Sequence, residues 1–202
     1  MHEKIEKEAK FYIRDLKKIE RKIKNLDGVI VQPRVFESNL RFDTHNRELS
    51  ASYQVLRLRQ DTRARLTYKE PADPNSEVSA RLEYEVEIND LTTGRHILEA
   101  LGYEVITIYE KYRTSYFLDD VEISLDEMPF GSFIEIEGAD AHKIQQMADK
   151  LNLKWENRSS LSYLRIFSQV KERLGLSMRD LTFDNFSTLD IQPGHLHLSY
   201  AD

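Results

Sequence analysis

Residues 5–13 read IEKEAKFYI, and residues 80–88 read ARLEYEVEI. Alternate side chains of a β-strand point to the same face. Glu6, Glu8 and Lys10 therefore share one face of the first segment. In the second segment a charged face, Arg81 with the glutamates at 83, 85 and 87, lies opposite an apolar one. Both stretches predict strands that separate a charged environment from an apolar one.

The same alternation recurs in five further segments. They are VLRLRQ (55–60), ARLTYKE (64–70), YEKYRTSY (109–116), VEISLDE (121–127) and FIEIEG (133–138). Residues 29–42 are also extended, with an interruption at Pro33. Together with the first two segments these give about eight strands, which short turns connect into a mostly antiparallel sheet.

Helical periodicity predicts four helices between and after the strands. The first, at 15–26, carries apolar residues at 16, 19, 23 and 26, with Gly28 placed as its C-terminal cap. The second runs from Asp90 or Thr92 to residue 101. The third begins after Asp140, and the fourth begins at Ser159 or Ser160.

The fold that follows is α+β. Helices cover the apolar faces of the strands, and the sheet closes into an eight-stranded antiparallel β-barrel, or tunnel, with a polar lumen. A sheet with its charged face in water is the alternative for any single strand. The sorting of acids and bases by strand favours the closed form.

Composition limits the class of protein. The chain has 202 residues, a net charge of −6, 32% charged residues and no cysteine. We expect a single domain over 1–202, with a core at about 5–155 and a C-terminal helical appendage at about 156–202. The charged start and the lack of a long apolar run predict a cytoplasmic protein that binds no membrane. The acidic balance argues against binding to nucleic acid.

A polar lumen would gather two complementary sets of side chains. The bases suited to a highly anionic ligand are Lys10, Arg57, Arg59, Lys69, Lys111 and Arg113. The acids suited to Mg²⁺ or Mn²⁺ are Glu6, Glu8, Glu83, Glu85, Asp126, Glu135 and Glu137. Both sets in one cavity predict a site for a complex of a divalent metal with a polyphosphate.

These motifs resemble those of the CYTH proteins, or triphosphate tunnel metalloenzymes. Their ExExK strand is matched by EKEAK at 6–10, and RFDT at 41–44 is similar to their second-strand signature. The segments LRLR (56–59), LTYK (66–69), RLEYEVE (81–87), EKYR (110–113) and LDEMPFGSFIEIEG (125–138) follow in the order of the family. The resemblance covers about residues 5–155.

The resemblance implies an enzyme that uses Mg²⁺ or Mn²⁺ to process a small triphosphate. The glutamates at 6, 8, 135 and 137 would hold metal with Asp126 beside them, and Glu83 and Glu85 would support the metal or orient the bases. The six bases would cradle the phosphates, and Lys10 or Lys69 could transfer protons if burial lowered its pKa.

Three functions stay open on the sequence. The first is hydrolysis of inorganic triphosphate, thiamine triphosphate or a nucleoside triphosphate such as ATP. The second is a class IV adenylyl cyclase, which ranks lower because residues 50–54, SASYQ, lack the His-Phe element associated with those cyclases. The third is a non-catalytic module that binds nucleotide or polyphosphate. A homodimer is a further expectation.

Overall fold

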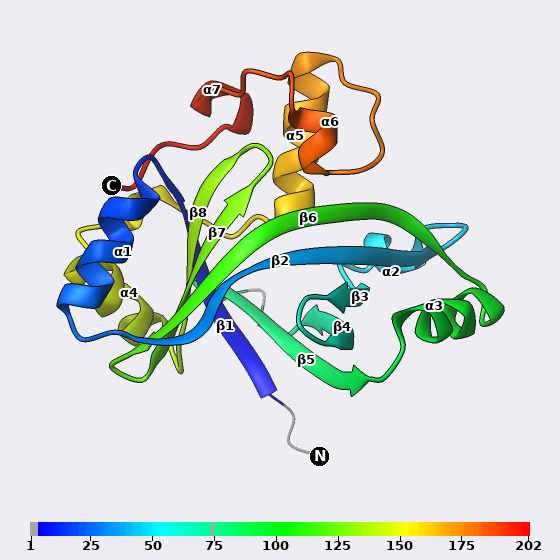
Figure 1. The fold of residues 1–202 in the computed structure, drawn as a ribbon, viewed down its shortest axis with the longest axis horizontal. Coiled ribbons are helices and arrows are strands. Elements are labelled where there is room, and N and C mark those ends of the chain that lie inside the picture. Colours follow the sequence, from blue (N-terminus) through cyan, green and yellow to red (C-terminus); the bar gives the residue numbers. More distant parts are fainter. Residues whose placement is uncertain (1–3, 74) are drawn as a thin grey trace.

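The computed structural model describes residues 4–73 and 75–202 (Figure 1). The strands are β1 (Lys4–Ile13), β2 (Val29–Thr44), β3 (Val55–Gln60), β4 (Ala64–Pro71), β5 (Ser79–Ile88), β6 (Tyr103–Leu118), β7 (Val121–Met128), β8 (Gly131–Glu137) and β9 (Arg158–Ser159). The helices are α1 (Leu16–Asn25), α2 (Glu48–Ala51), α3 (Leu91–Ala100), α4 (Ala141–Lys150), α5 (Tyr163–Leu174), α6 (Phe183–Phe186) and α7 (Pro193–Leu196), with a 3-10 turn, η1, at Trp155–Asn157.

Eight of these strands form a closed ring. The order is β5-β4-β3-β2-β6-β7-β8-β1, and β1 pairs with β5 to complete the circle. Every pair of neighbouring strands is antiparallel. The short strand β9 adds to β1 outside this order. The predicted α+β fold, with an eight-stranded antiparallel sheet that closes on itself and helices outside, is confirmed.

The helices cover the apolar outer faces of the ring. Helices α1 and α4 bury Ile23 and Met147 in one cluster with Ile123 of β7 and Ile136 of β8. Around β2 and β3 a second cluster forms, in which Leu98 of α3 is buried. Burial of each such side chain stabilises the fold by roughly 1.5–3 kcal/mol. The charged faces are thereby left to point into the ring.

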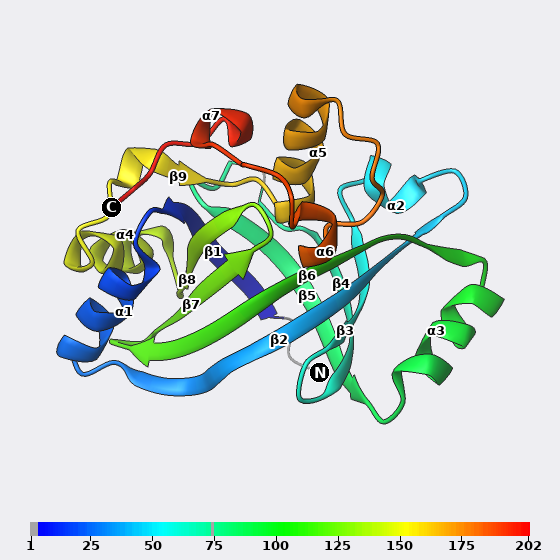
Figure 2. The same cartoon turned by 45° about the horizontal axis from the view of Figure 1, so that its top comes forward.

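The C-terminal segment packs against one end of the ring. Figures 1 and 2 show α5, α6 and α7 gathered beside the β7–β8 hairpin and β6. Phe167 and Phe186 from this segment share a buried cluster with Phe130 and Phe133. Residues from 160 onward therefore lie next to the interior of the ring.

Two helix boundaries differ from the predictions. The side chain of Ser162, rather than Ser159 or Ser160, caps α5 by accepting a hydrogen bond from the Arg165 amide. At the end of α1 the left-handed residue is Asp27, with φ 64°, and Gly28 is the residue after it. The Gly28 amide donates to the Ile23 carbonyl at 2.9 Å, so the glycine completes the cap one position later than expected.

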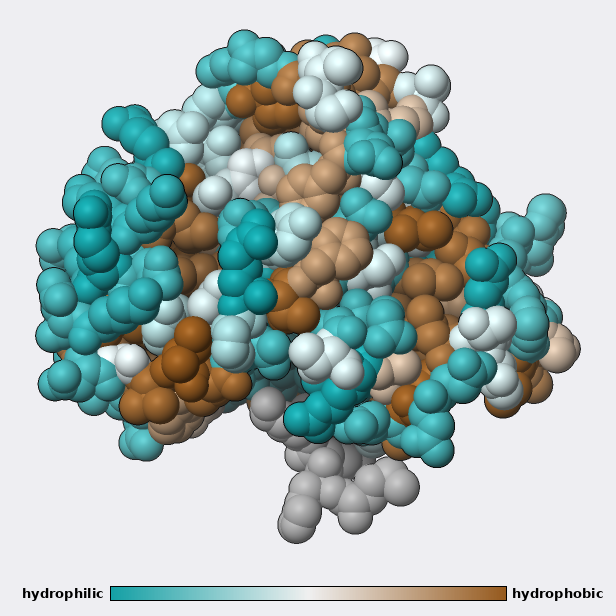
Figure 3. Space-filling model, viewed as in Figure 1, coloured by the Kyte–Doolittle hydropathy of each residue, from teal (hydrophilic) through white to brown (hydrophobic). Residues whose placement is uncertain are grey.

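Exposed apolar side chains gather where β2 begins. Val29, Ile30 and Val31 are 63%, 49% and 53% exposed, and Phe117, which pairs with Val29, is 47% exposed. Figure 3 shows a brown area over the start of β2 at the lower left. The expected homodimer is not tested by these observations. Among the described residues, no helix has both the length and the apolar character of a membrane span.

Replacement of Gly28 by alanine tests the α1 boundary. A Cβ at this position would lie 2.5 Å from Ile23 Cγ2 and 2.9 Å from the Ile23 carbonyl oxygen. Because Ile23 is fully buried, we expect Gly28→Ala to lower the unfolding free energy by about 1–3 kcal/mol in urea titration. Gly194→Ala is the control, since nothing lies within 4 Å of its added Cβ. Equal stabilities of the two variants would show that the end of α1 does not require glycine at position 28.

Candidate functional site: a charged cavity inside the ring

A cavity of about 1100 Å³ lies inside the ring and has contributions from all eight strands. The predicted site residues line it, with the exception of Asp126. Side chains from the C-terminal segment also line it, among them Leu161, Tyr163, Phe167 and Lys171. The ring therefore brings together residues that lie more than a hundred positions apart in the sequence.

Strand register explains this convergence. Residues directly opposite each other in antiparallel strands project to the same face. Lys10 of β1 stands opposite Glu135 of β8, and Lys69 of β4 stands opposite Glu83 of β5. Glu85 stands opposite Thr67, which in turn faces Arg57 on β3. The first two pairs place an acid and a base side by side, and the third set brings Arg57 Nη2 within 4.0 Å of Glu85 Oε2 across Thr67.

Ion pairs connect the two sets across the cavity. Lys69 Nζ lies 2.5 Å from Glu6 Oε2 and 3.3 Å from Glu83 Oε1. Lys10 Nζ lies 2.7 Å from Glu135 Oε1 and 3.6 Å from Glu8 Oε1. These side chains are largely buried, so the attraction is screened less than on the surface.

The pKa of Lys10 responds to these neighbours. Burial alone would lower it, but the carboxylates of Glu135 and Glu8 outweigh burial and raise the pKa above its ordinary value. The expected condition for proton transfer, a pKa lowered by burial, is therefore not met at Lys10. Lys10 is a permanent cation in this environment.

Asp126 does not lie on the cavity wall, where a metal ligand is expected. It is fully buried behind the wall, and its carboxylate accepts hydrogen bonds from three side chains. Arg113 Nε and Nη2 donate at 2.6 and 2.5 Å, Lys111 Nζ at 3.1 Å and the Tyr163 hydroxyl at 2.7 Å. Asp126 thus holds two bases of the cavity, Lys111 and Arg113, in position.

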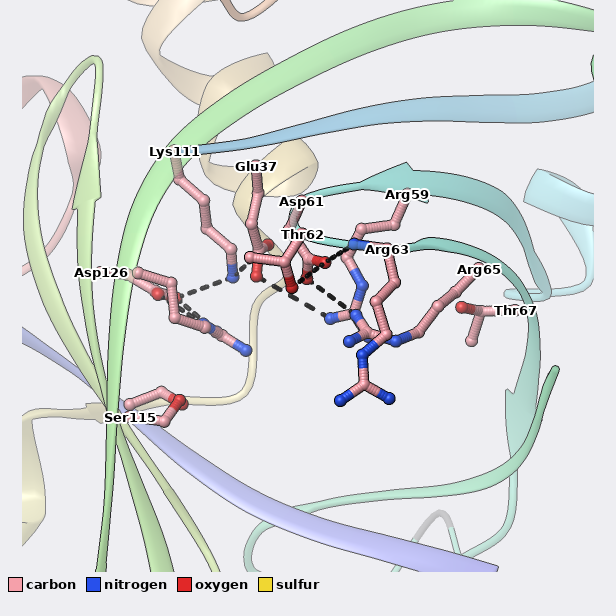
Figure 4. Close-up of polar contacts among 12 residues, drawn as sticks. Glu37, Arg59, Asp61, Thr62, Arg63, Arg65, Thr67, Lys111, Ser115 and Asp126 are labelled. Carbon is pink, nitrogen blue, oxygen red and sulfur yellow. Dashed lines mark hydrogen bonds and ion pairs between the residues drawn. The ribbon is translucent and has the colours of Figure 1, made fainter. Parts of the chain in front are cut away.

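Glu37 fixes bases in the same way, although the sequence analysis did not select it. It is 2% exposed and lies between Lys111, at 3.5 Å, and Arg59, at 3.9 Å (Figure 4). Burial would raise its pKa, but Lys111, Arg113 and Arg59 lower it to about 2. Glu37 therefore stays ionised and joins a base of β6 to a base of β3.

Other residues of the interior were also missed. Asn39 is fully buried and Arg41 is 8% exposed, and both follow Glu37 at intervals of two along β2. The Tyr109 hydroxyl accepts a hydrogen bond from Arg57 Nη1 at 3.0 Å. Period-two alternation from Glu37 to Asp43 was the available signal on β2. It was obscured by Pro33 and by the consecutive apolar residues before it.

The carboxylates of β1, β7 and β8 are suited to a hard cation. Glu8, Glu137 and Glu122 stand opposite one another on these three strands. Burial, with repulsion from Glu135 adding to it, raises the pKa of Glu8 to about 7. A divalent ion would relieve this crowding, and oxygen donors of this kind fit Mg²⁺ or Mn²⁺.

The acids of the cavity form ion pairs with its bases. Among residues 4–73 and 75–202, no three acidic or histidine side chains converge closely enough to enclose a metal ion. The donor chemistry of the site fits the ion, and Glu6, Glu8, Glu135 and Glu137 are the residues that would hold it. Their role as ligands stays a prediction.

The family model of the CYTH domain matches residues 4–175, and the chain belongs to this family. A protein of Methanocaldococcus jannaschii, provisionally named an adenylate cyclase, is 28% identical over 174 residues, covering 80% of this chain and 98% of that protein.

Two solved structures share the fold. One, from Vibrio parahaemolyticus and also provisionally named an adenylate cyclase, has a TM-score of 0.73 at 23% identity and covers 83% of this chain and 99% of its own. Another, from Hippeastrum, has a TM-score of 0.62 at 18% identity and covers 86% and 97%. It is described as a provisional adenylyl cyclase with a dominant triphosphatase activity.

The raised pKa of Glu8 predicts that the stability of the protein depends on pH. The folded protein holds the Glu8 proton up to about pH 7, whereas the ordinary carboxyl value is 4.5. Stability is therefore lost as the pH rises from about 4.5 to 7 in metal-free protein. Glu8→Gln removes this loss, so we expect it to raise the unfolding free energy at pH 8 by about 1–3 kcal/mol and to have little effect at pH 5.

Urea titration in EDTA at the two pH values measures this difference. Glu87→Gln is the matched control, because Glu87 is an exposed partner of Arg63 at 3.0 Å. A Glu8→Gln variant with the same advantage at pH 5 as at pH 8 would contradict the electrostatic explanation.

Proposed function

We propose that this protein is a divalent-metal-dependent enzyme that hydrolyses a small triphosphate bound in the cavity. The observation that carries the proposal is the pairing of six bases with carboxylates around one cavity of about 1100 Å³. Membership of the CYTH family supports a triphosphate as substrate. The activity described for the Hippeastrum relative supports hydrolysis.

The bases would bind the phosphate oxygens. They are Lys10, Arg57, Arg59, Lys69, Lys111 and Arg113. Each is paired with an acid, and this pairing holds the base in position. Charge-assisted hydrogen bonds from lysine and arginine to phosphate are short and strong. A well-placed donor of this kind contributes about 3 kcal/mol to stabilisation of the charge that develops in the reaction.

The acids would hold the metal. Glu6, Glu8, Glu135 and Glu137 would provide the ligands, with Glu83 and Glu85 in support. When bound, Mg²⁺ or Mn²⁺ neutralises phosphate charge and makes an attacking water a stronger nucleophile. Asp126 would act only through Lys111 and Arg113, because its oxygens are directed at those cations.

Of the two lysines considered for proton transfer, Lys10 is disfavoured and Lys69 stays the candidate. Lys10 keeps its proton because the neighbouring glutamates raise its pKa. Lys69 Nζ lies 2.5 Å from Glu6 and 3.3 Å from Glu83, among the acids that would hold or support the metal.

An adenylyl cyclase is the second candidate. The names of the Methanocaldococcus and Vibrio relatives favour it. The same cavity would then orient the 3′-hydroxyl of ATP toward the α-phosphorus and release cyclic AMP and pyrophosphate. A non-catalytic nucleotide or polyphosphate binder is the third candidate.

A product assay separates the three candidates. Purified protein with Mg²⁺ or Mn²⁺ is given inorganic triphosphate, thiamine triphosphate or ATP, and phosphorus NMR identifies what is released. We expect orthophosphate, from the preferred substrate first. Cyclic AMP with pyrophosphate would establish the cyclase instead. Binding without turnover would establish the non-catalytic module.

Variants on one hairpin connect this activity to the cavity. Arg59→Gln removes a base that lies 3.0 Å from Glu85 in the cavity, and should lower kcat/KM by about a hundredfold. Arg63→Gln is the control, because Arg63 belongs to the same hairpin (Figure 4). Its side chain is 61% exposed and pairs with Glu87. Equal activity of the two variants would exclude the cavity as the catalytic site.

Tyr163 offers a second prediction, on the positioning of two bases. Its hydroxyl donates to Asp126 at 2.7 Å, and its ring lies 4.4 Å from Lys10 Nζ. Tyr163→Phe keeps the ring and loses the donor, so Asp126 holds Lys111 and Arg113 less firmly. We expect KM for the triphosphate to rise about tenfold, in proportion to a lost hydrogen bond to a charged group.

Tyr12→Phe is the matched control for this variant. The Tyr12 ring packs 5.1 Å from Phe133, which Tyr163 also contacts, but its hydroxyl faces Tyr200. Steady-state kinetics well below the melting temperature should show an unchanged KM for Tyr12→Phe. A loss of thermal stability in Tyr163→Phe with KM unchanged would reduce Tyr163 to a purely structural role.

A further inference from the structure

The hydroxyl of Tyr109 has different neighbours from those of two other buried tyrosines. Tyr109 lies on the inner face of β6, and its side chain lines the cavity at 9% exposure. The hydroxyls of Tyr116 and Tyr163 each donate to a carboxylate, that of Glu20 and that of Asp126. The Tyr109 hydroxyl contacts a cation instead.

This contact leaves the Tyr109 proton free to be donated elsewhere. Arg57 Nη1 donates to the Tyr109 oxygen at 3.0 Å, and a guanidinium can only donate. The phenol oxygen is therefore the acceptor, and its own O–H keeps its capacity as a donor. Within residues 4–73 and 75–202, no group accepts a hydrogen bond from this O–H. Its acceptor would be a ligand of the cavity.

The surrounding charges favour release of this proton. Burial alone would raise the pKa of Tyr109, but Arg57 and Lys111 outweigh burial and lower the pKa below its ordinary value, with Glu37 opposing them. A phenolate at this position would also attract Arg41. In the described part of the chain, burial raises the pKa of the other tyrosines whose values are shifted, namely Tyr12, Tyr68, Tyr116 and Tyr163.

The elements packed around Tyr109 carry more cations than carboxylates. Helix α5 shares a buried cluster with Tyr109, and Leu181 bridges to it along the backbone. The charged or titratable groups of these elements and of the neighbouring strands are Arg57 and Arg59 of β3, Lys111 of β6, Glu37 and Arg41 of β2, Tyr163 and Lys171 of α5, and Arg179 and Asp180 before Leu181. The local field therefore stabilises an anion next to Tyr109.

The position of Tyr109 suits the leaving side of the reaction. Its neighbours Arg57 and Lys111 are bases that would bind phosphate, whereas the neighbours of Lys69 are acids that would hold or support the metal. In hydrolysis of a triphosphate, negative charge develops on the phosphate oxygen that leaves. A proton donor among the phosphate-binding bases can neutralise that charge.

We propose that Tyr109 is a further catalytic residue, a general acid that gives its O–H proton to the leaving phosphate oxygen. The inference rests on the proposed function, hydrolysis. An attacking water forms the new P–O bond, and the bridging P–O bond breaks with its electron pair on the leaving oxygen, which takes the Tyr109 proton. Arg57 and Lys111 stabilise the phenolate. A proton from solvent, equal to the one that the attacking water loses, then restores the hydroxyl.

Tyr109→Phe tests the proton transfer. It keeps the ring and removes the O–H, so we expect kcat to fall about a hundredfold or more, as is typical for loss of a general acid. KM should change far less than kcat. Tyr116→Phe is the matched control, because this buried tyrosine of the same strand also loses a hydrogen bond, to Glu20, but outside the cavity. Its kcat and KM should equal those of wild type.

The dependence of kcat on pH separates a proton donor from a purely structural hydroxyl. A general acid stops working when it ionises, so wild-type kcat should fall as the pH rises through the pKa of Tyr109, which lies below about 10. Tyr109→Phe should lack this fall. Site-specific replacement of Tyr109 by 3-fluorotyrosine keeps the hydroxyl but makes it more acidic, and should move the fall to lower pH.

The outcomes separate this inference from the function on which it rests. If wild-type protein does not hydrolyse any triphosphate, both are overturned. If it does and Tyr109→Phe keeps its kcat, or raises only KM and keeps the fall at high pH, Tyr109 merely positions Arg57 and the inference is overturned. If Tyr109→Phe does not fold, the fluorotyrosine protein decides, and an unmoved fall overturns the inference.

Discussion

Charges on the inner face of the ring have to compensate one another, and the rest of the structure depends on this constraint. The outer faces of the strands are apolar and covered by α1, α3 and α4. The inner faces therefore meet each other, the cavity and the start of α5. An isolated buried charge costs several kcal/mol, and a buried pair repays that cost only with good geometry. Acids and bases that stand opposite each other on neighbouring strands supply this geometry, as Lys10 does with Glu135 and Lys69 with Glu83.

Buried ion pairs of this kind are a poor way to stabilise a protein. Apolar residues of similar volume would often give equal or greater stability. The cavity is filled with charge instead, and Glu8 carries a pKa of about 7 as a result of burial and repulsion. Perturbed carboxylates beside fixed cations are typical of functional sites. The charges are better explained by a ligand that completes them than by any contribution to folding.

Period-two alternation is enough to predict which face of each strand is charged, and hence most of the cavity. It does not give depth along a strand. Glu122 and Asp126 lie on the same face of β7, yet Glu122 is exposed and Asp126 is fully buried behind the wall. The side chain of Glu37 joins Lys111 to Arg59 only because β2 runs between β6 and β3, an order that the sequence does not state.

Tyr163 shows the same limit for a helix. Helical spacing predicts an inward face of Leu161, Leu164, Phe167 and Leu174. Phe167 is indeed buried, and the three leucines are partly buried against the same cluster. Spacing cannot reveal that Tyr163, the first residue of α5, donates a hydrogen bond to Asp126, 37 positions earlier. Nor can it reveal that Lys10 Nζ lies over the Tyr163 ring. The Tyr163 hydroxyl donates to Asp126, and Asp126 accepts from Lys111 and Arg113. The C-terminal segment therefore helps to position two bases of the cavity. The hydrogen bond from Tyr163 to Asp126 thus joins α5 to Lys111 and Arg113.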